Sequence, residues 1–154
     1  GSHNQAYVFN ELLRMDIEGV RPLSIMLFSF CETSNNSKIY NNCLPQLDAL
    51  TKILSKGLRE NDIIRRLGQE SFIIVFPGTY EMDALKIAYR IKKSLEIYGN
   101  IQNNIFFGIA TKVIKSQNIW AVYKIAETRM YYSKQTGNRG HANEINHRNR
   151  ELHE

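Results

Sequence analysis

Arginine and aspartate stand three residues apart in the segment Arg59-Glu60-Asn61-Asp62, just before a short apolar run. An arginine fork can donate hydrogen bonds to O6 and N7 of guanine, and a carboxylate can accept from the N1 and N2 hydrogens. Arginine planes also stack on purines, and their charge pairs with phosphate. The pair therefore predicts a site for a guanine nucleotide. The alternative is structural: Asp62 helps to fold this turn, and Arg59 is only solvated.

A β-hairpin is the element expected to carry this pair. A short apolar run after Asp62 and a stronger one at Phe72–Phe76 are joined through a turn at Gly68-Gln69. Two β-capable runs joined by a two-residue loop predict a hairpin. Polar residues at its start and tip are then held on a rigid frame, which is where a binding site is most precisely built.

Hydrophobic spacing elsewhere predicts helices that alternate with strands. Helical spacing of apolar residues predicts helices over Gln5–Glu18, Leu44–Leu58, Glu81–Tyr98 and Ile119–Gln135. Apolar runs predict strands at Leu23–Phe30 and Ile105–Val113, and a short last strand at His141–Ile145. The expected fold class is α/β (α+β), with a central, mostly antiparallel five-stranded sheet flanked by helices. One domain is expected over residues 4–146, with residues 1–3 as a cloning remnant and residues 147–154 as a polar tail.

The composition is that of an ordinary globular domain. The chain has 154 residues, of which 43% are hydrophobic, and a net charge of +5. No apolar run is long enough to span a membrane, and no signal peptide is visible. Much of the positive charge lies within Arg129–Arg150, without interleaved aromatic residues, which favours a solvated basic tail over a nucleic-acid groove. Cys31 and Cys43 form neither a redox pair nor a zinc pattern and fit a reducing cytoplasm.

Five segments occur in the order of one known family. They are Pro22–Phe28 for its first strand PLSLLLL, Arg66–Phe72 (RLGQESF) for RYGGDEF, Phe76–Thr79 for lPxT, Gly108–Ala110 for the end of SIGVA, and Ala126–Gly137 for the helix ADxALYxAKxxGRN. On these motifs the chain resembles a GGDEF domain, the diguanylate cyclase fold, from Asn4 to Asn143. The family's DxLTGLxN opening would lie just before Asn4, so the resemblance implies an upstream sensor or receiver domain.

The resemblance also shows what the cyclase reaction would need. A cyclase condenses two GTP molecules, and its carboxylates hold two metal ions that activate a 3′-hydroxyl and neutralise phosphate charge. One metal ligand in the family is the first Asp of a DxD at the end of the first strand, where this chain has Ser29-Phe30-Cys31. The other is the fourth letter of GGDEF, here Ser71. A neutral serine cannot replace an ionised carboxylate around a hard divalent cation, so neither a metal nor a cofactor is expected.

Other positions of the family's active site are also changed. Gln69 follows Gly68 in place of the second glycine, which hinders close approach of a nucleotide to the backbone. Glu70 remains at the third letter, and Lys134 remains on the last helix. The family's guanine-reading Asp and Asn and the Arg of GRN correspond to Leu44, Asn35 and Asn138. The resemblance therefore implies a catalytically inactive site.

A second nucleotide site of the family keeps its residues. Many members carry RxxD before the GGDEF turn, as an inhibitory site for the product cyclic di-GMP. Arg59 and Asp62 have this pattern, with Asp62 six residues before Gly68, and the register after the hairpin puts Arg90 where the family has its third ligand residue. The resemblance implies that Arg59, Asp62 and Arg90 bind cyclic di-GMP. Arg66 stands where the family normally has Arg and is interpreted as structural.

The expected function is that of an inactive GGDEF domain acting as a cyclic di-GMP receptor in bacterial signalling. It would pass the second-messenger level to a partner protein, or to an upstream domain of the same polypeptide, in pathways such as biofilm or exopolysaccharide regulation. Two alternatives stay open. One is a dimerisation or protein-interaction module that binds no nucleotide. The other is residual GTP binding or cyclase activity that uses Glu70 and Lys134.

Overall fold

A computed structural model describes the chain over residues 2–29, 47–68, 71–98 and 105–136. Its elements are α1 (Ser2–Glu18), β1 (Leu23–Ser29), α3 (Leu47–Lys56), β2 (Ile63–Arg66), β3 (Ser71–Pro77), α4 (Glu81–Tyr98), β4 (Phe106–Lys112) and α5 (Ile119–Thr136). The predicted helices and the strands in these ranges are confirmed, and α1 starts three residues earlier than expected. The predicted polar loop after β1 and the last strand at 141–145 lie outside the described residues.

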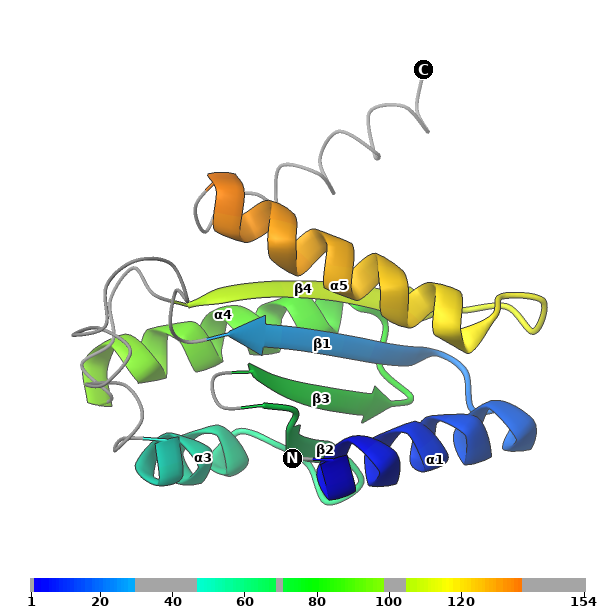
Figure 1. The fold of residues 1–154 in the computed structure, drawn as a ribbon, viewed down its shortest axis with the longest axis horizontal. Helices are drawn as coiled ribbons and strands as arrows, with labels where there is room; N and C mark the ends of the chain where they lie inside the picture. The colour runs from blue at the N-terminus through cyan, green and yellow to red at the C-terminus, as the bar shows by residue number, and fades with distance from the viewer. Residues whose placement is uncertain (1, 30–46, 69–70, 99–104, 137–154) are drawn as a thin grey trace.

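The strands form an antiparallel sheet in the order β2-β3-β1-β4 (Figure 1). Within the described ranges the sheet has four strands, where the sequence predicts five, because the segment expected to supply the fifth is outside them. The predicted hairpin is confirmed as the pair β2–β3, in which Arg66 lies opposite Phe72. The hairpin therefore occupies one side of the sheet and leaves β2 at its edge.

Helices cover both faces of the sheet. Side chains alternate along β1, so that Met26 and Phe28 join the core beneath α3 and α4, while Ile25 and Leu27 join the core beneath α1 and α5. All seven residues of β1 are buried, as its nearly continuous apolar run predicts for a strand covered on both faces. In Figure 1, α5 runs along β4, and α1 lies near the β2 edge.

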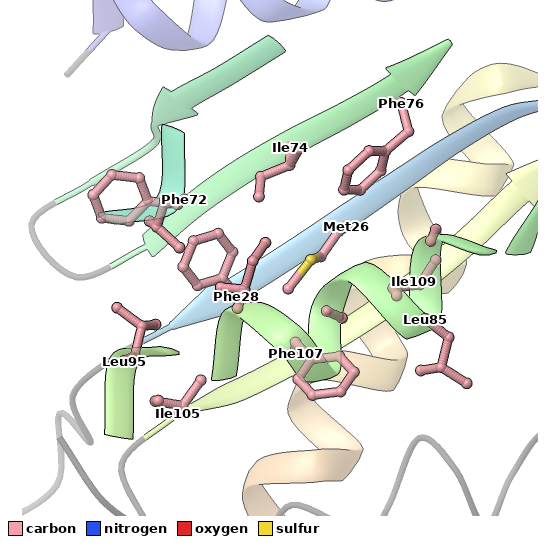
Figure 2. Packing of buried hydrophobic residues seen from close by; sticks show 14 residues of the cluster. Met26, Phe28, Phe72, Ile74, Phe76, Leu85, Leu95, Ile105, Phe107 and Ile109 are labelled. Carbon is pink, nitrogen blue, oxygen red and sulfur yellow. The ribbon is translucent and has the colours of Figure 1, made fainter. Parts of the chain in front are cut away.

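Aromatic packing fixes the register on the α3–α4 side. Phe28 of β1 faces Phe72 of β3 in the antiparallel register, and their rings stack with centroids 5.4 Å apart. Figure 2 shows both rings beside Met26 and Ile74, with Phe107 on the neighbouring strand. Full burial of a phenylalanine side chain contributes about 2–3 kcal/mol, so these rings hold the hairpin firmly against β1. The frame beneath the candidate site is therefore rigid.

Local signals explain where the helices near the hairpin begin. Asn118 accepts hydrogen bonds through Oδ1 from the backbone N–H groups of Trp120 and Ala121, at 2.8 and 3.3 Å, and so caps α5. The first turn of α4 carries Glu81 and Asp83, whose charges suit the positive end of the helix dipole. None of the helices in the described ranges is long and apolar enough to cross a bilayer.

Candidate functional site

Arg59 and Asp62 close the turn between α3 and β2. The backbone N–H of Asp62 donates to the carbonyl of Arg59 at 3.1 Å, and the backbone N–H of Arg59 donates to Asp62 Oδ2 at 2.8 Å. Arg59 Nη2 also forms an ion pair with Asp62 Oδ1 at 3.2 Å. The Asp62 side chain is only 1% exposed, so the turn is built around a covered carboxylate. The predicted pairing of these two residues is present, and it also has the structural role that the alternative interpretation named.

The guanidinium group of Arg59 is held from two sides and is open on a third. Its Nη2 donates to the carbonyl of Pro77 at 3.1 Å and to Oγ1 of Thr79, which tie it to the connection between β3 and α4. Thr79 is buried, and its own carbonyl accepts a hydrogen bond from Ser24 Oγ at 2.6 Å. Arg59 nevertheless keeps 57% of its side chain exposed. A fixed, solvent-facing guanidinium plane is suited to stacking on a base or pairing with a phosphate.

Arg90 lies in a neighbouring groove between α3 and α4. The groove has a volume of about 490 Å³ and is lined by Ile53, Lys56, Gly57, Ile87, Arg90, Ile91 and Ser94. Gly57, two residues before Arg59, connects this groove to the Arg59 turn. Within the described ranges, no hydrogen bond or ion pair joins Arg90 to Arg59 or Asp62. The structure therefore brings Arg59 and Asp62 into contact and places Arg90 on the adjacent surface.

Ser29 and Ser71 meet at the strand ends that the resemblance assigns to catalysis. They are directly opposite in the β1–β3 register, and Ser29 is fully buried. Across the described ranges, no cluster of three or more His, Cys, Asp or Glu side chains is arranged to hold a metal ion. Cys31, Gln69 and Glu70 lie outside those ranges, so the expected loss of metal ligands stays a prediction. The same holds for the other aligned positions, Asn35, Leu44 and Asn138.

A smaller pocket of about 170 Å³ lies beside Gly68 and Ser71, between the hairpin and α5. Tyr123, Glu127 and Tyr131 of α5 contribute to its wall. Burial, with added repulsion from Glu127 and Tyr131, raises the pKa of Tyr123, so its phenol is neutral at physiological pH. Lys134, retained from the family's last helix, places its Nζ 5.9 Å from the centre of the Tyr131 ring.

Two residues of the site region were not predicted as site residues from the sequence. Thr79 was noted only as part of a family motif, and its contact with Arg59 spans twenty residues. Lys56 shares the groove with Arg90. Its signal in the sequence is a basic residue in the last turn of a predicted helix, three positions before Arg59.

Comparison with known proteins identifies the family. The family described as "Diguanylate cyclase, GGDEF domain" matches residues 45–140, which is more than half of the chain. The chain therefore belongs to the GGDEF family, and the resemblance found in the sequence is confirmed.

Among curated proteins, the chain is similar to "Diguanylate cyclase A" of Treponema denticola, with 27% identity over 123 residues. The match covers 75% of this chain and 33% of that relative, so the chain spans about a third of its length.

Solved structures show the same fold. The FimX GGDEF domain from Pseudomonas aeruginosa superposes with a TM-score of 0.71 and 16% identity, covering 88% of each chain. The GGDEF domain of DgcB from Caulobacter crescentus, solved in complex with c-di-GMP, gives a TM-score of 0.64 and 15% identity, covering 84% of each chain. Both likenesses confirm an antiparallel sheet flanked by helices.

Proposed function

We propose that this GGDEF domain does not synthesise cyclic di-GMP and instead binds it, as a receptor, through Arg59, Asp62 and Arg90. The observation that carries the proposal is the Arg59–Asp62 pair, which holds an exposed guanidinium beside the groove that contains Arg90. Preorganisation of this kind reduces the ordering cost of binding. A structure of a related GGDEF domain contains c-di-GMP, which supports this ligand class.

The contacts of Asp62 assign it a particular part in the site. Both of its oxygens accept from Arg59, and its side chain is covered. For Asp62 to accept from guanine N1 and N2, Arg59 would have to release at least one oxygen. In the pose seen here Asp62 positions Arg59, and Arg59 offers its open face to the ligand.

The serines at the ends of β1 and β3 support the absence of catalysis. Phosphoryl transfer on GTP needs metal ions that neutralise developing charge. Ser29 and Ser71 occupy the positions that the family uses for two of the carboxylate ligands, and hydroxyl groups do not replace them around a hard cation.

Calorimetric titration with cyclic di-GMP tests the receptor proposal. We expect wild-type protein to bind with a Kd in the micromolar range, which corresponds to roughly −8 kcal/mol. Arg59→Ala removes charge-assisted contacts of about 1.5–3 kcal/mol and should weaken binding by roughly 10- to 100-fold. Arg90→Ala should weaken it similarly. Absence of heat at tens of micromolar protein, or equal affinity in Arg59→Ala, would end the receptor proposal.

A surface observation favours a second candidate, a module for self-association. Leu13 and Ile17 lie one turn apart on α1 and are 43% and 77% exposed. Val113 and Ile114, also exposed, follow Lys112, which forms an ion pair with Asp16 of α1. Apolar side chains thus gather near one end of α1, as at many interfaces. A dimer seen by light scattering without nucleotide, and lost in Ile17→Glu, would favour this candidate.

In the receptor proposal, the domain reports second-messenger level to another protein or to a further domain of its own polypeptide, in the cytoplasm. The short span of the match to its curated relative leaves room for such a domain. Ligand bound at Arg59 and Arg90 would change the surface formed by the hairpin start, α3 and α4, and that surface is where we expect the partner to respond.

A further inference from the structure

We infer that Lys56 is a fourth ligand-contacting residue, and that its ammonium group and the Arg90 guanidinium bind one phosphate of cyclic di-GMP in the α3–α4 groove. This inference rests on the proposed receptor function and extends it to a residue that neither the RxxD motif nor the register with the family indicates. It begins from the lining of the groove, where Lys56 comes from α3 and Arg90 from α4.

The two cations reach one groove from two different helices. Lys56 lies in the last turn of α3, and Arg90 lies in the third turn of α4. Because α3 and α4 pack against each other, residues 34 positions apart in the sequence face the same space. An anion between them would be contacted from both helices at once.

The charge of the groove is not neutralised by its own lining. Two of its seven lining residues are cationic, and none is acidic. Within the described ranges, neither Lys56 nor Arg90 forms an ion pair, in contrast to Arg59, whose charge is matched by Asp62. Two unpaired cations in one concave surface repel each other, and an anion placed between them relieves that repulsion. The position of Lys56 at a helix C-terminus stabilises its charged form.

The remaining lining matches the rest of such a ligand. Ile53, Ile87 and Ile91 provide apolar surface, and Ser94 provides a hydroxyl group. A volume of about 490 Å³ lies within the range of small-molecule pockets. Cyclic di-GMP combines flat purine faces with two phosphodiesters, each of one negative charge. The groove therefore suits a phosphate and part of a base, while the Arg59 turn beside it suits a guanine.

A charge series at Lys56 tests the inference, with cyclic di-GMP as the titrated ligand. Lys56→Arg keeps the charge and should bind within about twofold of wild type, whereas Lys56→Gln should bind about five- to tenfold more weakly. Lys56→Glu should weaken binding further, because it adds an acidic group to the groove. Lys93→Gln is the matched control: Lys93 is also an exposed lysine, on α4, but it does not line the groove. Thermal unfolding of each variant checks that the fold is retained.

Three results are distinguishable. If Lys56→Gln loses affinity, Lys93→Gln does not, and the loss shrinks at high salt, the inference is supported. If wild type binds and loses affinity in Arg59→Ala, but Lys56→Gln behaves like Lys93→Gln, the inference is overturned and the receptor function stands. If wild type does not bind cyclic di-GMP at all, the receptor function is overturned and the assignment of Lys56 is overturned with it.

Discussion

Ser29 of β1 lies directly opposite Ser71 of β3, at the strand ends where the GGDEF family places metal-binding carboxylates. Ser29 is fully buried there, in a sheet whose register is set by the neighbouring Phe28–Phe72 pair. Two neutral hydroxyl groups at these positions cannot supply the charge that a pair of magnesium ions requires. The first prediction follows from this pair.

Incubation with GTP and magnesium or manganese should yield no cyclic di-GMP. The physical reason is that the charge developing on the transferred phosphate has no metal ions to neutralise it. Anion-exchange chromatography of the reaction mixture measures the product, with an active diguanylate cyclase run in parallel. Any product above the enzyme-free blank, abolished in Glu70→Ala, would instead establish residual cyclase activity.

Thr79→Val should lower both stability and ligand affinity. The substitution removes the hydroxyl oxygen that accepts from Arg59 Nη2 and keeps the shape of the side chain. We expect the free energy of unfolding to fall by about 1 kcal/mol, and affinity for cyclic di-GMP to fall a few-fold because Arg59 is less firmly held. Urea denaturation and calorimetry measure the two effects. Stronger binding in Thr79→Val would mean that Arg59 must leave Thr79 to reach the ligand.

Gly108→Ala should destabilise the protein by about 3 kcal/mol. A Cβ at this position of β4 would collide with the backbone of α5, at the carbonyl of Ala126 and the N–H of Met130. Backbone atoms of a packed helix cannot move aside as a flexible side chain can. Chemical denaturation measures the loss. Gly57→Ala is the control, since the nearest atom to its added Cβ is 3.9 Å away, and equal losses in the two variants would contradict the prediction.

Glu81→Ala should lower the free energy of unfolding by about 2 kcal/mol. Glu81 Oε1 accepts from Arg129 Nη1 at 3.0 Å, and the Arg129 side chain is only 1% exposed. Removing one partner leaves a buried charge with less compensation, a loss that reaches about 3–5 kcal/mol in a fully buried pair. Glu81 is 28% exposed, and the carbonyl of Ile109 still accepts from Arg129, so a smaller loss is expected.

The control for that measurement is Glu18→Ala. Glu18 pairs with Arg14 on the surface, where both side chains are about half exposed. Surface pairs of this kind contribute less than about 1 kcal/mol. Equal destabilisation by Glu81→Ala and Glu18→Ala in urea would show that the buried pair has no special role.

Stability should fall at alkaline pH, partly through Tyr123. Burial raises the pKa of this phenol in the folded protein, so the unfolded chain loses its proton at lower pH than the folded one. The folded state then binds more protons than the unfolded state above about pH 10, and the free energy of unfolding decreases as pH rises through that window. Tyr123→Phe should flatten this decrease. Denaturation curves at pH 8 to 11 measure it, and identical slopes in the two proteins would contradict the prediction.

The sequence predicted the elements and the family well. The continuous apolar run at Leu23–Phe30 indicated a strand buried on both faces, and β1 is that strand. The helical spacing in Glu81–Tyr98 predicted α4 with its bounds and its inward residues, among them Ala84, Leu85 and Leu95. These features depend on local periodicity, which neighbouring residues determine. The family motifs are likewise short segments, and the match over residues 45–140 confirms them.

The candidate site could be predicted only in part. Arg59 and Asp62 are three residues apart, so their turn is a local feature that the RxxD spacing already indicates. The burial of Asp62 beneath Arg59 could not be predicted, because it depends on where the β3–α4 connection places Thr79. The Arg129–Glu81 pair was missed for a similar reason, since it joins residues 48 apart on two helices.

The sequence by itself determined the order of helices and strands, the membership of the GGDEF family and the identities of Ser29, Ser71, Arg59 and Asp62. These follow from periodicity and from residue types at short spacing. Only the tertiary structure decided that Arg59 is anchored to Thr79, and that Lys56 and Arg90 line one groove. The physical reason is that contacts between distant segments arise when α3, α4 and the hairpin pack on a common sheet, and no local pattern specifies the distances that this packing produces.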